Sequence, residues 1–206
     1  MPDDAPLPRE AFDKQDRGND LAFYAPPRLV THIDVAAIAA LTALYREVLP
    51  RDARVLDLMS SWVSHLPEDR DYVEIVGHGM NRDELAANPR LRRSFVQDLN
   101  SDPLLPLDTN AFDAALCCVG VQYLQQPYAV FGEIRRVVTA GSPFVVSYSN
   151  RCFPTKAVAV WRSLDMTGQA ALIRHYMEHA GFDRIEPKVL ADGTRGDPLV
   201  AVVGRA

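Results

Sequence analysis

The spacing most suggestive of chemistry lies near the C-terminus, where His175, Glu178 and His179 spell H-x-x-E-H. On a helix the two histidines would share one face, as they do in one class of zinc proteases. That motif needs a third ligand from a later helix, whereas here the predicted helix ends at Gly181 and a β-hairpin is expected to follow. We therefore interpret the motif as a chance pattern on a surface helix, and we expect no metal site.

A second group of polar residues lies in the segment FYAPPRLVTHID, residues 23–34. Tyr24, Arg28 and His32 recur there at near-helical spacing beside two prolines. One interpretation is that these three side chains face a substrate. The other, held as equal, is a solvated helix start in which Arg28 pairs with Asp34.

A third group, SYSNRCFPTK, follows a predicted strand, and polar residues at the carboxyl end of a strand are where α/β proteins place function. Asn150 and Arg151 are expected to orient a substrate, Arg151 by clamping an anionic group. Lys156 is expected to face solvent. His65 follows another strand and is a candidate general base, although a lone histidine of this kind is more often structural. No residue is assigned as the catalytic base.

The elements that must position these residues alternate between two periodicities. Helical spacing predicts helices at residues 29–48, 82–88, 127–138, 155–164 and 167–180. Short apolar runs predict strands at residues 55–58, 72–77, 94–99, 112–121, 143–149, 183–190 and 198–204. The connections after Leu58 and Leu99 are short or Pro-rich, so any helices there are expected to be short or absent. This alternation predicts an α/β sandwich with a mostly parallel sheet and a terminal antiparallel hairpin.

The composition limits which classes of protein this chain can belong to. The chain has 206 residues, a formal net charge of −5 and 48% hydrophobic residues, as expected of one globular domain. We expect residues 1–20 to form a flexible arm and residues 21–206 a single domain. The acidic balance gives no general attraction to nucleic acid, and no apolar run is long enough for a membrane span. Three cysteines without a framework spacing fit a reducing compartment, so a cytoplasmic location is expected.

Four segments, in this order, resemble the class I S-adenosylmethionine-dependent methyltransferases, in particular their small, type 11-like methyltransferase domains. They are VLDL at 55–58, QDLNSDPLLPLDTNAFDAALCCVGVQYL at 97–124, EIRRVVTAGSPFVVSYSNR at 133–151, and the terminal AGFDRIE and DPLVAVVGR. The resemblance runs from Ala53 to the C-terminus. It implies a Rossmann-like three-layer sandwich with a mostly parallel seven-stranded sheet, and S-adenosyl-L-methionine as the cofactor.

The chain departs from the family at the cofactor site. The first strand of the family normally runs into D-x-G-x-G-x-G, whereas Asp57 is followed by LMSSWV, without a glycine. Ser60 and Ser61 could cap a helix starting there and meet the methionine carboxylate at its N-terminus. Gly79 stands where the family has a ribose-binding carboxylate, and Asn81 could hydrogen-bond the ribose instead.

The resemblance also implies that Asp98 contacts the adenine amine and that residues 119–122 face the cofactor and the methyl acceptor. The cofactor-binding residues that it implies are Asp57, Met59, Ser60, Ser61, Gly79, Met80, Asn81, Asp98, Leu99 and Val119. The expected substrate-binding residues are Tyr24, Arg28, His32, Gln122, Asn150 and Arg151.

Three functions remain open on the sequence. The first is methyl transfer from S-adenosylmethionine to a small molecule. The second is a non-catalytic, methyltransferase-like binding protein, suggested by the missing glycines and the missing ribose carboxylate. The third is a Rossmann-like domain that binds another nucleotide. No partner other than a small-molecule substrate is expected, and the oligomeric state is left open.

Overall fold

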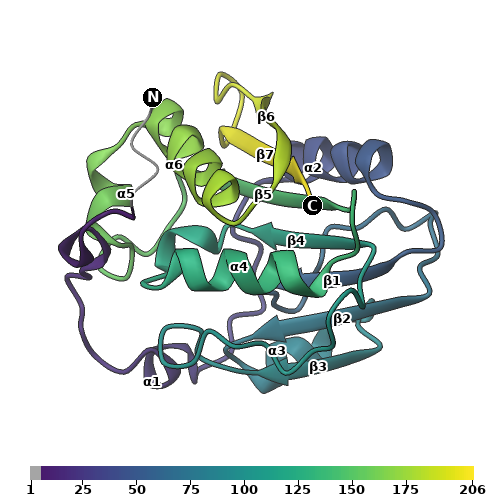
Figure 1. Ribbon diagram of the computed structural model, residues 1–206, viewed down its shortest axis with the longest axis horizontal. Coiled ribbons are helices and arrows are strands. Elements are labelled where there is room, and N and C mark those ends of the chain that lie inside the picture. The colour runs from purple at the N-terminus through teal and green to yellow at the C-terminus, as the bar shows by residue number, and fades with distance from the viewer. Residues whose placement is uncertain (1–5) are drawn as a thin grey trace.

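The computed structural model describes residues 6–206 and is built on one seven-stranded sheet (Figure 1). The strands lie in the order β3-β2-β1-β4-β5-β7-β6. All neighbouring pairs from β3 to β5 are parallel, and β7 runs antiparallel to both β5 and β6. The expected parallel sheet with a C-terminal antiparallel hairpin is therefore confirmed. The strand bounds are β1 Arg54–Leu58, β2 Glu74–Gly79, β3 Arg93–Val96, β4 Ala114–Cys118, β5 Pro143–Ser149, β6 Asp183–Ala191 and β7 Leu199–Arg205.

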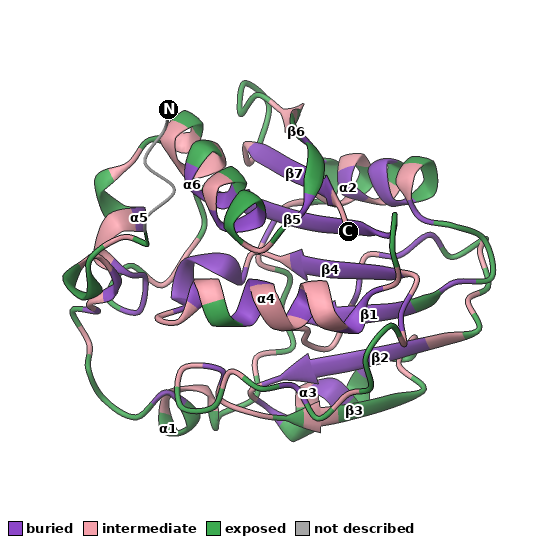
Figure 2. Cartoon of the chain, in the orientation of Figure 1, coloured by how far each residue is buried: buried purple, intermediate pink, exposed green. Residues whose placement is uncertain are grey.

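Helices cover both faces of the sheet, which makes the fold a three-layer sandwich (Figure 1). Successive residues of a strand point to opposite faces, so in β5 Phe144 and Val146 pack with the helices α4 and α6 while Val145 packs with α2. Figure 2 shows β4 and β5 as almost entirely buried. The helix bounds are η1 Arg9–Phe12, α1 Asp20–Tyr24, α2 Val35–Val48, α3 Arg82–Ala87, η2 Val121–Tyr123, α4 Pro127–Val137, α5 Ala159–Ser163 and α6 Met166–His179.

The first long helix starts later than its apolar spacing predicts. The expected helix at residues 29–48 begins only at Val35, because the Asp34 side chain accepts a hydrogen bond from the Ala37 backbone N–H and caps the helix there. The same carboxylate also accepts from the backbone N–H of Asp197. The alternative pairing of Asp34 with Arg28 is therefore wrong, and residues 25–33 lie outside any helix.

The N-terminal arm packs against the domain from Leu7 onward, where the Leu7 backbone N–H donates to the Tyr128 hydroxyl. Phe12 is buried, and Lys14 pairs as an isolated β-bridge with Val158, just before α5. The backbone N–H of Asp16 donates to the Thr155 carbonyl. No structural boundary therefore lies at residue 20, and of the expected arm only residues 1–5 fall outside the described part.

A buried ionic cluster fixes this arm. Lys156, expected to face solvent, is 1% exposed, and its Nζ lies 2.9 Å from Asp20 Oδ1 and 3.1 Å from Asp16 Oδ2. Lys14 pairs with the other oxygen of Asp20 at 2.5 Å. Burial would lower the pKa of Lys156, but the hydrogen bonds to Asp20 and Asp16 raise it, so the ammonium stays charged. The prediction for Lys156 was wrong because its partners come from a segment more than 130 residues away.

Removing the lysine of this cluster should destabilise the protein strongly. In Lys156→Met the buried Asp20 keeps only one cationic partner, and breaking a buried pair from one side costs about 3 kcal/mol or more. The matched control is Arg174→Ala, which removes an exposed i,i+4 pair with Glu178 and should cost about 0.5 kcal/mol or less. Urea unfolding of both variants measures the difference, and equal losses would contradict the structural role of Lys156.

Candidate functional site

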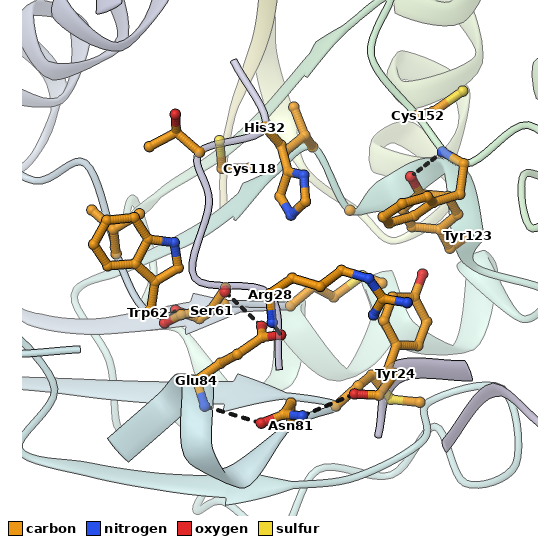
Figure 3. A pocket seen from close by; sticks show the side chains of 18 of the residues that line it. Tyr24, Arg28, His32, Ser61, Trp62, Asn81, Glu84, Cys118, Tyr123 and Cys152 are labelled. Carbon is orange, nitrogen blue, oxygen red and sulfur yellow. Dashed lines mark hydrogen bonds between the residues drawn. The ribbon is translucent and has the colours of Figure 1, made fainter. Parts of the chain in front are cut away.

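One large cavity lies at the carboxyl ends of β1, β2 and β4. It has a volume of about 530 Å³ and is also lined by the N-terminal segment, residues 20–34, and by the loop at residues 151–153 (Figure 3). This is where an open α/β sheet places its ligands. Thirteen of the predicted site residues line it: Asp57, Met59, Ser60, Ser61, Met80, Asn81, Asp98, Leu99, Val119, Tyr24, Arg28, His32 and Arg151.

Three predicted site residues do not line the cavity. Gly79 lies in the buried end of β2, and Asn150 is exposed after β5. Gln122 is buried beneath the cavity, and its amide N–H donates to the Val119 carbonyl at 2.8 Å. Val119 holds φ at 46°, which is a strained conformation for a β-branched residue. Gln122 therefore supports the backbone at the end of β4.

The loop after β1 is clamped onto the end of β2 by His78. The backbone N–H of Met59 donates to His78 Nδ1 at 3.1 Å, so the proton of the imidazole lies on Nε2, which donates to the Gln97 carbonyl at 2.9 Å. Burial lowers the pKa of His78 to about 4, so the ring is neutral at physiological pH. A backbone bond from Ser60 N–H to the His78 carbonyl, at 2.7 Å, completes the clamp. The sequence analysis did not single out His78.

No helix follows β1, so the expected capping role of Ser60 and Ser61 is wrong. Both serines lie in irregular backbone, and their hydroxyls donate to carboxylates instead. Ser60 Oγ donates to Asp57 at 2.7 Å, and Ser61 Oγ donates to Glu84 at 2.6 Å. A helix N-terminus for the methionine carboxylate is therefore missing at this position. The short connection did predict that a helix would be short or absent here.

The position of the missing ribose carboxylate is closed. A Cβ built on Gly79 would lie 2.5 Å from the Ser60 carbonyl oxygen, so the clamped loop occupies the space that a side chain would need. Asn81 does not substitute for that carboxylate. Its Oδ1 accepts from the backbone N–H groups of Asp83 and Glu84, capping α3, and its Nδ2 donates to the Tyr24 and Ala25 carbonyls.

Two other carboxylates do reach this part of the cavity. Glu84, in the first turn of α3, accepts from the Arg28 backbone N–H at 2.7 Å as well as from Ser61 (Figure 3). Asp98 accepts from Asn100 N–H and Ser101 Oγ, which fixes its carboxylate beyond β3. The sequence analysis missed Glu84. The signal available was its place two residues into the helix after β2, since that helix starts at the sheet edge that holds the site.

Asp57 is the most deeply buried acid of the cavity. Burial raises the pKa of its carboxyl to about 6, and hydrogen bonds from the Ser60 and Ser64 hydroxyls oppose that rise. The group therefore titrates close to the physiological range, unlike an exposed aspartate. A carboxylate with a raised pKa in a cavity is a common feature of functional sites.

Two imidazoles lie together in the cavity. Burial lowers the pKa of His65 to about 4, with a smaller contribution from His32, and burial also lowers the pKa of His32. Both rings are neutral at physiological pH and can accept a proton. By contrast, His175 of the H-x-x-E-H pattern contacts the Tyr128 hydroxyl at 3.0 Å. Among residues 6–206, no three His, Cys, Asp or Glu side chains are grouped as metal ligands.

The close approach at Gly79 gives a direct test of the clamped loop. Gly79→Ala should destabilise the protein by about 1–3 kcal/mol, because the added methyl meets a backbone carbonyl that cannot swing aside. Gly132→Ala, in the middle of α4 with nothing within 4 Å of the added Cβ, should instead stabilise it by up to about 1 kcal/mol. Thermal unfolding compares them, and a neutral Gly79→Ala would show that the loop does not lie against β2.

The comparisons with known proteins agree with the geometry. Residues 61–146 match the family model described as "Methyltransferase domain", which covers less than half of the chain. None of the curated proteins matches the sequence. In the described part of the chain, no helix has the length and apolarity that a membrane crossing requires.

Many solved structures share the fold. A chain from the complex of the Haloferax volcanii methyltransferase activator Trm112 with a methyltransferase has a TM-score of 0.63 at 18% identity, covering 82% of this chain and 90% of that one. An S-adenosylmethionine-dependent methyltransferase from Mesorhizobium loti has a TM-score of 0.57 at 16% sequence identity, and the match covers 82% of this chain and 98% of that one. An S-adenosylmethionine-dependent methyltransferase from Thermotoga maritima has a TM-score of 0.59 at 16% sequence identity, and the match covers 83% of this chain and 90% of that one. Sheet order and terminal hairpin are those of the class I S-adenosylmethionine-dependent methyltransferase fold, and residues 61–146 match the methyltransferase-domain model, so the resemblance to this superfamily is confirmed.

Proposed function

We propose that the protein is an S-adenosylmethionine-dependent methyltransferase acting on a small-molecule acceptor. The observation that carries the proposal is the cavity at the ends of β1, β2 and β4, which keeps Asp57 and Asp98 in its lining although the glycines of the loop are gone. Its volume of about 530 Å³ lies in the range of small-molecule and cofactor sites.

The residues that line the cavity fit the adenosyl cofactor, but the ribose would be bound by a different residue than in the methyltransferase family. Asp98 has acceptor capacity left for the adenine amine, and Leu99 adds buried apolar surface beside it. The ribose would have to be held by Glu84, because the position at Gly79 is closed and Asn81 is fully engaged. Asp57 would lie near the methionine part, close to the strained backbone of Met59.

When bound, the cofactor supplies a methyl group activated on a sulfonium for attack by a nucleophile. The chain's own residues then have two tasks, which are to orient the acceptor and to remove its proton. His32 is a neutral imidazole in the cavity and would take that proton, whereas burial lowers the pKa of His65 to about 4 and makes it a weaker base. Tyr24 and Arg28 line the same space and would position the acceptor.

A second candidate is a binding protein that transfers no methyl group. It is favoured by one observation, which is that the Ser60 carbonyl fills the place of the family's ribose-binding side chain. The fold admits other chemistry, since the [4+2]-cyclase SpnF has a TM-score of 0.56 at 15% identity, covering 80% of this chain and 79% of that one. Binding of a different nucleotide in the same cavity is the third possibility.

Calorimetric titration with S-adenosylhomocysteine tests the proposal. We expect binding that, at 100 times the dissociation constant, stabilises the protein by about 2.7 kcal/mol. Asp98→Asn should weaken binding by roughly tenfold or more, because it removes a charged acceptor. The matched control is Asp102→Asn, four residues away and exposed, which should leave affinity unchanged. No binding at millimolar ligand would refute the proposal, and a response to another nucleotide alone would favour the third possibility.

A further inference from the structure

Arg28 is placed in the cavity by both its backbone and its side chain. Its backbone N–H donates to Glu84 Oε1 at 2.7 Å, which ties the N-terminal segment to α3. Its guanidinium carbon lies 4.8 Å from the centre of the Phe23 ring, 5.7 Å from that of Tyr24 and 5.3 Å from that of Phe153. Three aromatic rings therefore surround a half-buried cation, and Figure 3 shows Tyr24 beside Arg28.

This cation lacks a charged partner. Among residues 6–206, no carboxylate oxygen lies within ion-pair distance of the Arg28 guanidinium. Its two terminal nitrogens donate only to the Phe23 carbonyl at 2.9 Å and, more weakly, to the Pro26 carbonyl at 3.5 Å. A guanidinium carries five N–H donors, so most of its donors remain available.

Three acids that line the cavity have hydrogen-bond partners other than the Arg28 guanidinium. Both oxygens of Glu84 already accept hydrogen bonds, from the Arg28 backbone and from Ser61. Asp34 accepts from two backbone N–H groups, and Asp197 pairs with Arg151. A half-buried guanidinium with unused donors and no ion-pair partner is suited to bind an anion of a ligand.

We propose that Arg28 is the anion-binding residue of this cavity, and that it holds a carboxylate of the bound ligand. The shape of the guanidinium favours a carboxylate. Its planar fork of N–H groups matches a two-oxygen anion, and the Phe23 and Pro26 carbonyls engage only some of those donors. The carboxylate comes either from the methionine part of the cofactor or from the methyl acceptor. The identity of these ligands rests on the proposed function, whereas the anion site itself does not.

The test compares Arg28→Gln with Arg17→Gln in three titrations. The ligands are S-adenosylhomocysteine, its analogue without the carboxylate, and benzoate added to protein with and without S-adenosylhomocysteine. Arg17→Gln is the control, because this arginine lies in the same N-terminal segment but is exposed, paired with Asp13 and outside the cavity lining. Arg28→Lys keeps the positive charge but loses the two parallel N–H donors of the guanidinium, so it should retain part of the affinity for the carboxylate ligand. This variant replaces Arg28→Gln in the test if Arg28→Gln folds poorly.

Two results support the proposal and identify the source of the carboxylate. If the cofactor supplies it, Arg28→Gln weakens S-adenosylhomocysteine roughly tenfold to a hundredfold and leaves the decarboxylated analogue unchanged. If the acceptor supplies the carboxylate, Arg28→Gln binds S-adenosylhomocysteine as tightly as the wild-type protein does, and its affinity for benzoate falls by a similar factor. Arg17→Gln changes neither S-adenosylhomocysteine binding nor benzoate binding.

Two results overturn it. The first is unchanged binding of S-adenosylhomocysteine and of benzoate in Arg28→Gln. The second is an equal loss for S-adenosylhomocysteine and its decarboxylated analogue, which would mean that Arg28 only holds the N-terminal segment in place. Failure of the wild-type protein to bind either adenosyl compound would refute the proposed function instead, and the benzoate titration of ligand-free protein would still decide on Arg28.

Discussion

The neutral imidazole of His78 is the contact on which the rest of the site depends. It accepts from the Met59 backbone after β1 and donates to the Gln97 carbonyl after β3, so one side chain ties the exits of three neighbouring strands. Burial keeps the ring uncharged, so Nδ1 can only accept and Nε2 can only donate a hydrogen bond. A protonated ring would lose its acceptor, and the loop after β1 would lose its anchor.

This anchor explains how the chain forms a cavity without a glycine-rich loop. Glycines in that loop normally let the backbone approach a cofactor and lead into a helix. Here the loop turns toward β2 instead, and the Ser60 carbonyl rests against Gly79. The N-terminal segment supplies the other side of the cavity, and the buried pairs of Lys14 and Lys156 with Asp20 fix that segment.

Local signals in the sequence predicted most of the sheet and part of the site. Apolar runs and a proline at the helix start placed β5 and α4 closely, because each of these elements is bounded by its own residues. The places of Asp57 and Asp98 came instead from the resemblance of the segments around them to the methyltransferase family. The partners of Lys156, Glu84 and His78 could not be predicted, since each is set by a segment that is distant in the chain. Ser60 and Ser61 were misread because small polar residues suit a helix cap and a hydrogen-bonded loop equally well.

We propose that the loop held on β2 by His78 belongs to a working adenosyl site. A crystal structure of the protein with S-adenosylhomocysteine tests this most directly. We expect the ligand in the cavity with its adenine beside Asp98. We also expect the Ser60 N–H to remain hydrogen-bonded to the His78 carbonyl, a bond that measures 2.7 Å in the structure described above. A ligand bound only after the loop has left β2, with a new helix following β1, would contradict it.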